Sequence, residues 1–383
     1  MIGRKFIGAI VLVCAITTEG NAQSMDFNGI KNSAVNMMQG SGSQGEKKIP
    51  SPSILFSTPI QVLFGYPEQV MFSVLNQACS LIMTSNIKKP LVTPKPEEMY
   101  YQLRTSCKNI TVPLQQPENL VNLPEFDINK KVVIFLSGWA TTGSEDHIQE
   151  LANAYNCRGD YNFVYLNIAD KIETLYIWSA LNTEEIGKAV AESLNKLTSS
   201  VSIENIHLIG ISFGAQVVGA VGRKFKELTG QPLPRITGLD PANPCFNKNS
   251  GIHRGDAMFV DIIHTNPGVL GKSEPLGDVD FYVGGKKPIQ PGCLQFSCSH
   301  LRSVDYYIET VLPGNEANFM GKRCDSVESL NANHCDGPEH PMGYSTPHDV
   351  EGIHYLEANA QRPYGQNAPA NANDHHCGHC GDE

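Results

Sequence analysis

The chain has 383 residues, 41% hydrophobic and 18% charged, with a formal net charge of −10, which allows one large domain or two ordinary ones. The acidic balance argues against nucleic acid or an anionic membrane as an electrostatic partner, and the apolar share argues against a disordered chain. The meaning of the eleven cysteines depends on the redox compartment.

Residues 1–22 have the pattern of a secretory signal peptide. Two basic residues precede an apolar run over residues 6–16, and the small residue Ala22 marks the expected cleavage point. A membrane-spanning helix needs about 20 apolar residues, and no segment here reaches that length. We therefore predict a secreted, extracellular protein without a transmembrane segment. Removal of Cys14 with the signal leaves ten cysteines, for which disulfides are expected, and the sequon at Asn109 predicts a glycoprotein.

Residues 23–94 are predicted to form a flexible leader and N-terminal segment. Gly, Ser, Asn, Gln and Lys dominate residues 24–53, a composition typical of flexible chains. An apolar stretch over residues 70–83 favours a helix, and the Pro- and Lys-rich residues 88–96 favour a linker.

From about residue 131 apolar runs alternate with segments of helical spacing. Five runs are predicted to be strands: 132–136, 162–168, 206–209, 235–239 and 257–263. Helices are predicted over four segments: 145–155, 182–197, 214–226 and 304–311. Strands that alternate with helices predict an α/β fold with a mostly parallel central sheet and helices on both faces.

The third predicted strand runs into Gly210-Ile211-Ser212-Phe213-Gly214. The spacing Gly-x-Ser-x-Gly places the serine in a sharp strand-to-helix turn, with its hydroxyl exposed above the sheet. Alone, the motif is weak, because a serine in a Gly-rich turn is more often structural. Here a predicted strand precedes it and a predicted helix follows, so Ser212 is the candidate nucleophile.

A serine nucleophile needs a histidine base, and the histidine needs an orienting carboxylate. In this fold class the chain order is serine, acid, histidine. Asp240 follows the fourth predicted strand, where parallel sheets place catalytic groups, although an Asp before Pro241 also fits a plain turn. His264 ends the fifth strand and His300 precedes a predicted helix. The residues themselves do not rank the two histidines.

Four segments carry a resemblance to a known family: 209–215, 236–246, 259–265 and 298–303. In this order they resemble the pancreatic-type lipase family of secreted α/β-hydrolases, which includes triacylglycerol lipases, phospholipases A1 and catalytically silent insect yolk proteins. The resemblance covers about residues 95–365. It implies Ser212 as nucleophile, Asp240 as acid and His300 as base, with His264 structural. The yolk-protein branch has lost its serine, whereas Ser212 is present here.

An oxyanion hole needs two backbone N–H groups that face the developing negative charge. One donor is expected at Phe213, immediately after the nucleophile. The other is expected at Trp139, because Ser137-Gly138-Trp139 stands in the place of the family's His-Gly-aromatic. The indole of Trp139 would line the acyl site, with plain core packing as the alternative. Apolar Ile211 and Phe213 replace the family's His and Leu, which should shift substrate preference.

Two loops that cover the cleft in similar lipases are short in this chain. Cys293 and Cys298 match the disulfide that closes the lid and enclose only four residues, with Leu294 and Phe296 at the rim. The second covering loop, residues 265–277, is also short. Short loops of both kinds resemble phospholipases A1 more than triacylglycerol lipases, and they predict an open cleft that also accepts soluble short-chain esters.

Residues 250–256 stand where some family members hold a structural calcium ion. Their one hard ligand is Asp256, whereas calcium usually takes six or more oxygens. We therefore predict no metal, and nothing in the sequence indicates a cofactor.

The resemblance pairs Cys324 with Cys335. Four further cysteines have no assigned partner: Cys79, Cys107, Cys157 and Cys245. Residues 366–383 are predicted to be a disordered tail. Within it, residues 375–380 have the spacing of a metal half-site, but a local disulfide or adventitious metal binding is the plainer interpretation.

The sequence thus predicts one catalytic domain over residues 95–365 and, since the chain stops soon after it, no C-terminal β-sandwich. The predicted function is a secreted serine carboxylic-ester hydrolase that cleaves phospholipids at the A1 position or neutral glycerides through an acyl-enzyme. The alternative is a catalytically weak lipid-binding or yolk-type storage protein. The predicted partners are the lipid ester and, at the cleft rim, lipid surfaces; the oligomeric state is open.

Overall fold

The computed structural model describes residues 95–138, 146–168, 176–246 and 250–369, together with Ala372, Cys377 and Cys380; the side chains of 176–178 are not among them. The predicted signal peptide, leader and N-terminal helix lie outside these ranges. Within them, no helix has both the length and the apolarity of a membrane span.

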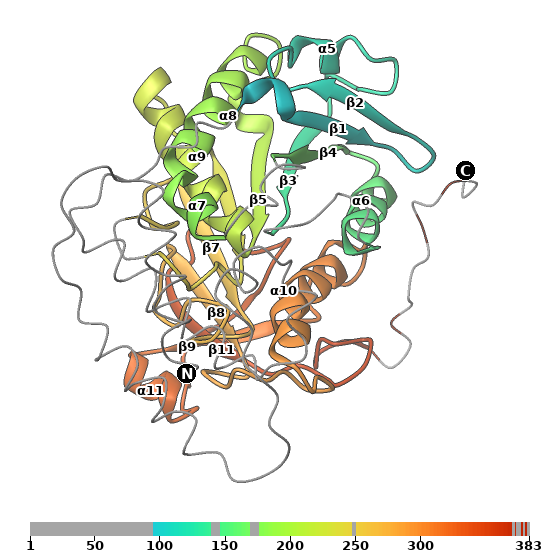
Figure 1. Cartoon of the computed structure of the whole chain (residues 1–383). Coiled ribbons are helices and arrows are strands. Elements are labelled where there is room, and N and C mark those ends of the chain that lie inside the picture. The colour runs from blue at the N-terminus through green and yellow to red at the C-terminus, as the bar shows by residue number, and fades with distance from the viewer. Residues whose placement is uncertain are drawn as a thin grey trace, which may run out of the picture.

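A central sheet of 11 strands has the order β10-β9-β11-β8-β7-β6-β5-β3-β4-β1-β2 (Figure 1). The strands are β1 (Tyr100–Arg104), β2 (Asn109–Pro113), β3 (Lys131–Leu136), β4 (Tyr161–Asn167), β5 (Ile206–Ile211), β6 (Arg235–Leu239), β7 (Phe259–His264), β8 (Val279–Val283), β9 (Met320–Cys324), β10 (Glu339–Pro341) and β11 (Gly352–Leu356). From β4 through β11 neighbouring strands pair in parallel. Antiparallel pairs extend the sheet at both edges. The predicted α/β fold with a mostly parallel sheet is confirmed.

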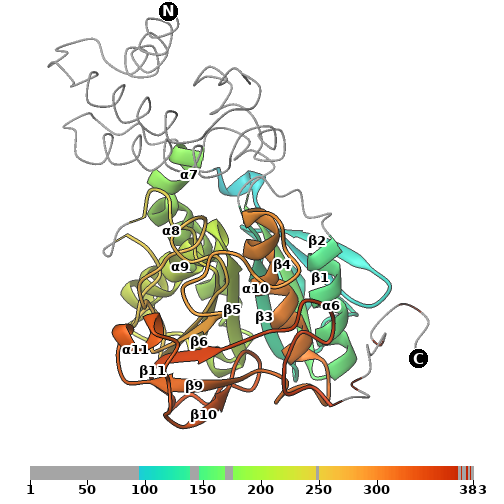
Figure 2. The same cartoon turned by 90° about the horizontal axis from the view of Figure 1, so that it is seen from below.

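Helices cover both faces of this sheet. They are α5 (Glu118–Val121), α6 (Asp146–Arg158), α7 (Tyr176–Leu181), α8 (Thr183–Leu197), α9 (Phe213–Thr229), α10 (Phe296–Val311) and α11 (Val327–Asn331), with short 3-10 helices at Pro96–Glu98 and Ile203–Asn205. The pair α8 and α9 packs on one face and the pair α6 and α10 on the other, as Figure 2 shows. The molecule is therefore a three-layer sandwich around one sheet.

Strand β3 shows why the central strands have continuous apolar sequences. Val132 and Ile134 point into the core under α8 and α9, whereas Val133 and Phe135 point into the core under α6 and α10. Alternate side chains of a strand face opposite sides of the sheet, so a strand covered on both faces needs apolar residues at every position. All five strands and all four helices that were predicted from residue 131 onward are present.

Strands β1, β2, β8, β9, β10 and β11 were not predicted from the sequence. Most lie toward the sheet edges, where polar residues interrupt the pattern, as in the exposed Lys322 and Arg323 of β9. Strand β8 is buried but contains Asp280, whose carboxylate is bonded to the ring of His264. A satisfied buried charge gives no apolar signal in the sequence.

The predicted disulfides Cys293–Cys298 and Cys324–Cys335 are confirmed. The predicted local disulfide in the tail is wrong. Cys380 pairs with Cys107 in the turn between β1 and β2, and Cys377 pairs with Cys157 at the end of α6, across 273 and 220 residues of sequence. Because their sulfurs are in disulfides, neither tail cysteine supplies the thiolate that a metal half-site needs.

The histidine pair His340 and His354 predicts how stability depends on pH. His354 in β11 is buried, 3.0 Å from His340, and its pKa is lowered to about 4, first by burial and then by the charge of its neighbour. The unfolded chain, with a histidine pKa near 6.5, therefore binds more protons than the folded chain between about pH 6.5 and 4. The contribution of this buried, neutral histidine to the free energy of unfolding is complete above about pH 6.5 and is lost as the pH falls toward 4.

Between pH 7 and 5, the unfolding free energy of the parent should fall by about 1–2 kcal/mol more than that of His354→Gln, because the variant lacks the buried histidine. Urea unfolding at both pH values measures the difference. His334→Gln, a change at an exposed histidine, is the control and should keep the parent profile. Equal losses in the parent and His354→Gln would contradict the prediction.

Candidate active site

Ser212 lies in the turn that joins β5 to α9. Its backbone has φ 57 and ψ −121, a conformation that a residue other than glycine adopts only under strain. A Cβ on Gly210 would collide with the backbone of Gly214, and one on Gly214 would collide with the carbonyl of Leu136. The Gly-x-Ser-x-Gly spacing is therefore a packing requirement. Backbone hydrogen bonds hold the turn, since Ser212 N donates to the carbonyl of Leu239 at 2.9 Å.

Asp240 follows β6 directly and its side chain is fully buried. Its Oδ1 accepts hydrogen bonds from the backbone N–H groups of Thr265 at 2.9 Å and Asn266 at 3.0 Å. Its Oδ2 lies 2.5 Å from Nδ1 of His300. Gly271 lies so close that a Cβ there would collide with the carboxylate. These contacts hold the carboxylate in one orientation, aimed at His300.

His300 lies near the N-terminal end of α10, and its side chain is only 12% exposed. Because its Nδ1 faces a carboxylate oxygen, Nδ1 carries the ring proton and its N–H donates a hydrogen bond to Asp240. Nε2 then keeps a lone pair, the state required of a general base. The hydroxyls of Ser303 and Thr265 donate to the carbonyl of His300 and fix the start of the helix.

His264, the other candidate base, lies in a separate buried pair. Its Nε2 is 2.8 Å from Asp280, its Nδ1 is 3.0 Å from the carbonyl of Lys272, and its ring stacks on Tyr282 at 4.1 Å. Both ring nitrogens are therefore engaged away from Asp240. The structure thus places His300, and not His264, against the carboxylate.

The loop that follows β3 passes beside the Ser212 hydroxyl. A Cβ placed on Gly138 would lie 3.8 Å from Ser212 Oγ, and Ser137 Oγ is 3.0 Å from the hydroxyl of Tyr165. Trp139, the next residue, lies outside the described residues, as does its expected oxyanion contact. Phe213 is the first residue of α9, where the positive end of the helix dipole favours an oxyanion.

Neither short loop near the site forms a long cover. Leu294, between Cys293 and Cys298, is 98% exposed. The loop at 265–277 packs against the body of the domain, since Lys272 N donates to the carbonyl of Pro241 at 2.9 Å and Lys272 is buried. The disulfide thus closes the expected four-residue loop, and the open cleft stays a prediction.

Gln290 is a buried residue of the site region that sequence reasoning missed. Its side-chain amide donates to the carbonyls of Thr265 at 2.9 Å and Val283 at 2.6 Å, and its backbone N–H donates to Ser299 Oγ. It therefore joins the loop that holds Asp240 to the helix that carries His300. An isolated glutamine gives no sequence signal for such a role.

The segment expected to lack calcium is held by a guanidinium group. Arg223 of α9 donates to Asp256 at 2.8 Å, to the carbonyl of Gly251 at 3.1 Å and to Glu184 at 2.5 Å. Burial raises the pKa of Asp256, and the positive charge of Arg223 opposes that shift. In the described part of the chain, no three His, Cys, Asp or Glu side chains are arranged to hold a metal ion.

We expect Arg223→Gln to cost about 3 kcal/mol of unfolding free energy, because it leaves the fully buried Asp256 without its countercharge. Lys224→Gln, which removes a more exposed cation on the same helix, should cost less than about 1 kcal/mol. Urea unfolding measures both, and excess EDTA should leave the parent curve unchanged. A parent transition that shifts with EDTA would show that a metal ion, and not Arg223, stabilises this segment.

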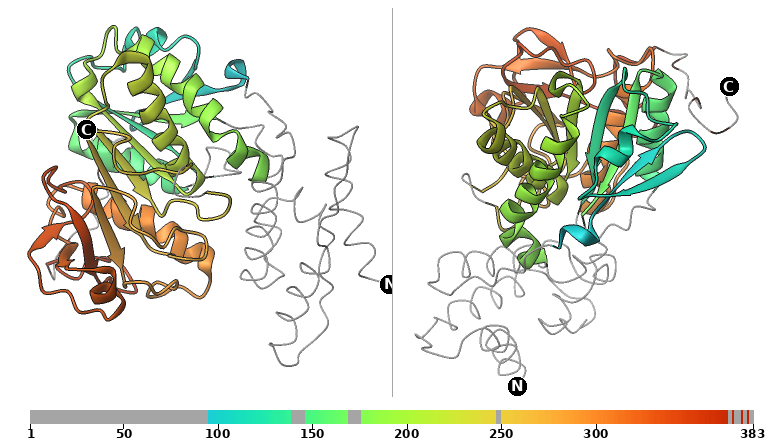
Figure 3. Two further views of the ribbon diagram at one scale, coloured as in Figure 1. Left: turned by 90° about the vertical axis from the view of Figure 1, so that its left-hand side faces the viewer. Right: turned by 90° about the horizontal axis from the view of Figure 1, so that it is seen from above.

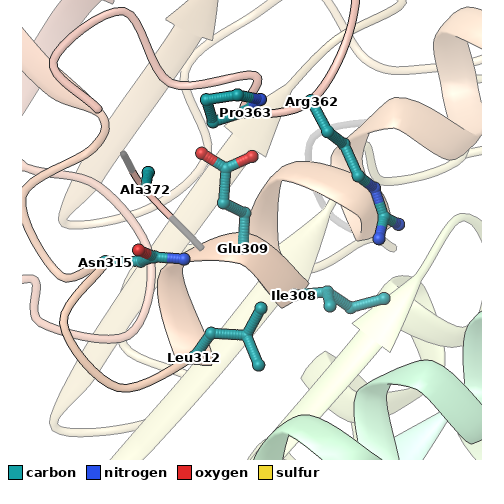
Figure 4. Close-up of a pocket in the computed structure, with 7 residues that line it drawn as sticks. All are labelled: Ile308, Glu309, Leu312, Asn315, Arg362, Pro363 and Ala372. Atoms are coloured by element: carbon teal, nitrogen blue, oxygen red, sulfur yellow. The ribbon is translucent and has the colours of Figure 1, made fainter. Parts of the chain in front are cut away.

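A pocket at the opposite end of α10 has a different role (Figure 4). Its lining residues are Ile308, Glu309, Leu312, Asn315, Arg362, Pro363 and Ala372. The carboxylate of Glu309 accepts from the backbone N–H groups of Tyr364 at 2.7 Å and Gly365 at 3.0 Å. These hydrogen bonds beside the pocket anchor the C-terminal segment to α10. The pocket contains none of the candidate catalytic side chains.

Comparison with known proteins gives one family and two kinds of relative. The model of the family described as Lipase matches residues 76–364. Vitellogenin-1 of Ceratitis capitata is 36% identical over 60% of this chain and 54% of its own length. Pancreatic lipase-related protein 2 of Rattus norvegicus is 30% identical over 56% of this chain and 51% of its own, and lipase member H-A of Xenopus laevis is 30% identical over 60% and 52%. The chain therefore spans about half the length of these relatives.

Proposed function

Because this chain belongs to the lipase family, we propose that it is a secreted serine carboxylic-ester hydrolase that cleaves lipid esters through an acyl-enzyme on Ser212. The observation that carries the proposal is the 2.5 Å hydrogen bond from His300 to a buried Asp240. Asp240 and the strained serine turn follow the carboxyl ends of the neighbouring strands β6 and β5. The strained turn costs stability, and both features have a purpose in catalysis. The disulfides support an oxidising compartment and hence secretion.

The proposed reaction follows from the protonation state of His300. Its Nε2 takes the proton of Ser212 as Oγ attacks the ester carbonyl carbon, and the N–H groups of Phe213 and Trp139 hold the resulting oxyanion. The histidine then gives the proton to the departing alkoxide, which leaves an acyl-enzyme. A water molecule, deprotonated by the same nitrogen, releases the fatty acid. Asp240 stays ionised throughout and stabilises the positive imidazolium.

The short loops indicate which esters fit. The Cys293–Cys298 loop encloses four residues, and the loop at 265–277 packs against the body of the domain. With little to displace from the cleft, we propose a substrate class of phospholipids cleaved at the A1 position, in preference to triglycerides, together with soluble short-chain esters. The exposed Leu294 supplies an apolar contact with a lipid surface at the rim.

The second candidate function is that of a yolk-type, lipid-retaining protein without turnover. It is favoured by the 36% identity to Vitellogenin-1, against 30% to pancreatic lipase-related protein 2. It is opposed by the retention of Ser212 in its strained turn together with the His300–Asp240 pair, because a storage protein has no need of either.

A substrate panel on the purified full-length protein separates the two functions. The enzyme should hydrolyse phosphatidylcholine vesicles and a short-chain p-nitrophenyl ester, with triolein slowest, and should react with a fluorophosphonate probe at Ser212. A protein that retains lipid but neither labels nor hydrolyses any of the three esters supports the storage function instead. A lysophospholipid product that keeps the acyl chain at position 1 and has lost the one at position 2 would change the assigned position of cleavage. It would not change the reaction class.

A further inference from the structure

Strand β2 is the outermost strand at one edge of the sheet. It pairs with β1 in the register Arg104 to Asn109 and, among the described residues, with no other strand. A strand at a sheet edge presents N–H and C=O groups that can pair with a strand of another chain, so edges of soluble proteins are usually protected. Exposed side chains at this edge are therefore informative about how the protein stays soluble.

The sequon Asn109-Ile110-Thr111 begins at the first residue of this edge strand. Exposure alternates along the strand, with Asn109 and Thr111 exposed and Val112 buried in the core. The acceptor asparagine and the required threonine thus lie on the same exposed face, two residues apart, and the middle residue is not proline. The sequence contains no other Asn-x-Ser or Asn-x-Thr sequon.

The position of Asn109 keeps it away from the candidate active site. Strand β1 runs antiparallel to β4, with Tyr100 opposite Asn167 and Leu103 opposite Val164. The turn between β1 and β2 therefore lies at the amino ends of the parallel strands, whereas Ser212 and Asp240 follow the carboxyl ends of β5 and β6. The hairpin of β1 and β2, coloured cyan, projects from the side of the molecule in the right-hand view of Figure 3. A bulky group on Asn109 would leave the cleft open.

The disulfide next to the sequon forms too late to block modification. Cys107 pairs with Cys380, 273 residues further along the chain. The chain is synthesised and translocated from its N-terminus, so the sequon is available well before its neighbour can be cross-linked. The order of synthesis therefore favours modification of Asn109 on a still open chain.

From these observations we propose that Asn109 carries an N-linked glycan and that this glycan shields the outer edge of β2 from pairing with other chains. The ligand class is an oligosaccharide attached through the side-chain amide, which is bulky, polar and solubilising. It would add, at the start of β2, to the edge protection that the exposed Pro113 provides at its end. The proposal does not depend on catalysis and extends to either candidate function.

Occupancy is tested on the full chain secreted from eukaryotic cells. Treatment with peptide N-glycosidase should lower the mass by one core glycan and convert Asn109 to aspartate, as read by mass spectrometry. Asn109→Gln and Thr111→Ala should abolish the shift, whereas Thr111→Ser should retain it because serine also completes the sequon. Parent protein whose mass is unchanged by the enzyme would overturn the proposal.

Shielding is tested by two variants that both lack the glycan. Thr111→Ala leaves the edge bare, whereas Thr111→Lys places an edge lysine, a charge that disfavours strand pairing. Light scattering at increasing concentration should show association of Thr111→Ala, and monodisperse parent and Thr111→Lys protein. Monodisperse Thr111→Ala would overturn the shielding role. If a variant is not secreted, trimming the folded parent with an endoglycosidase that leaves a single sugar on Asn109 gives the same comparison, because this treatment creates no charge at the edge.

Discussion

Ser212→Ala is expected to lower kcat for ester hydrolysis by about 10⁵–10⁶ while leaving the protein folded. Loss of the nucleophile costs about this much where serine, histidine and aspartate act as a unit. The change removes one hydroxyl and keeps the Cβ, and no hydrogen bond between Ser212 Oγ and another described residue is lost with it. Initial rates with a soluble p-nitrophenyl ester measure the loss, and urea unfolding reports the fold.

A second variant separates the hydroxyl from the strain. Ser212→Gly should be equally inactive but more stable by about 1 kcal/mol, because glycine adopts a φ of 57 without penalty. Ser202→Ala, a change at an exposed serine elsewhere, should keep full activity. Ser212→Ala protein as active as the parent would falsify the nucleophile assignment. An inactive parent that does not react with a fluorophosphonate would instead favour the storage function.

The parts of the fold that could be predicted are those with a local physical signature. Strand β3 is apolar at every position because both faces are covered, and the serine turn needs glycine at 210 and 214 because the backbones touch. Each constraint leaves a pattern within a short stretch of sequence, even where the contact is distant, as between Gly214 and the carbonyl of Leu136. These patterns can therefore be recognised in the sequence.

What could not be predicted depends on contacts between distant parts of the chain. His264 ends a predicted strand and His300 precedes a predicted helix. Only the folded sheet shows that Asp240 lies against the histidine 60 positions later. The disulfides of Cys377 and Cys380 span more than 200 residues, so the predicted local disulfide within the tail joined the wrong partners. The resemblance to lipases supplied the histidine but gave no help with the tail.

Asp240→Asn is expected to lower kcat by about 10⁴ with little change in KM. The amide oxygen should replace Oδ1, which accepts from the backbone N–H groups of Thr265 and Asn266. The amide NH₂ group then faces Nδ1 of His300. Two donors cannot bond, so the histidine loses its Nδ1 proton and carries it on Nε2 instead. That nitrogen can no longer accept the proton of Ser212.

The matched control is Asp280→Asn, the same substitution in the second buried histidine–aspartate pair. Asp280 is bonded to His264 at 2.8 Å and also accepts from the backbone N–H groups of Leu276 and Gly277. Losing that charge should cost about 1–3 kcal/mol of unfolding free energy but leave kcat within a few-fold of the parent. If the two variants exchanged these effects, His264 and not His300 would be the base. Steady-state kinetics and urea unfolding on both proteins therefore decide between the two histidines that the sequence left open.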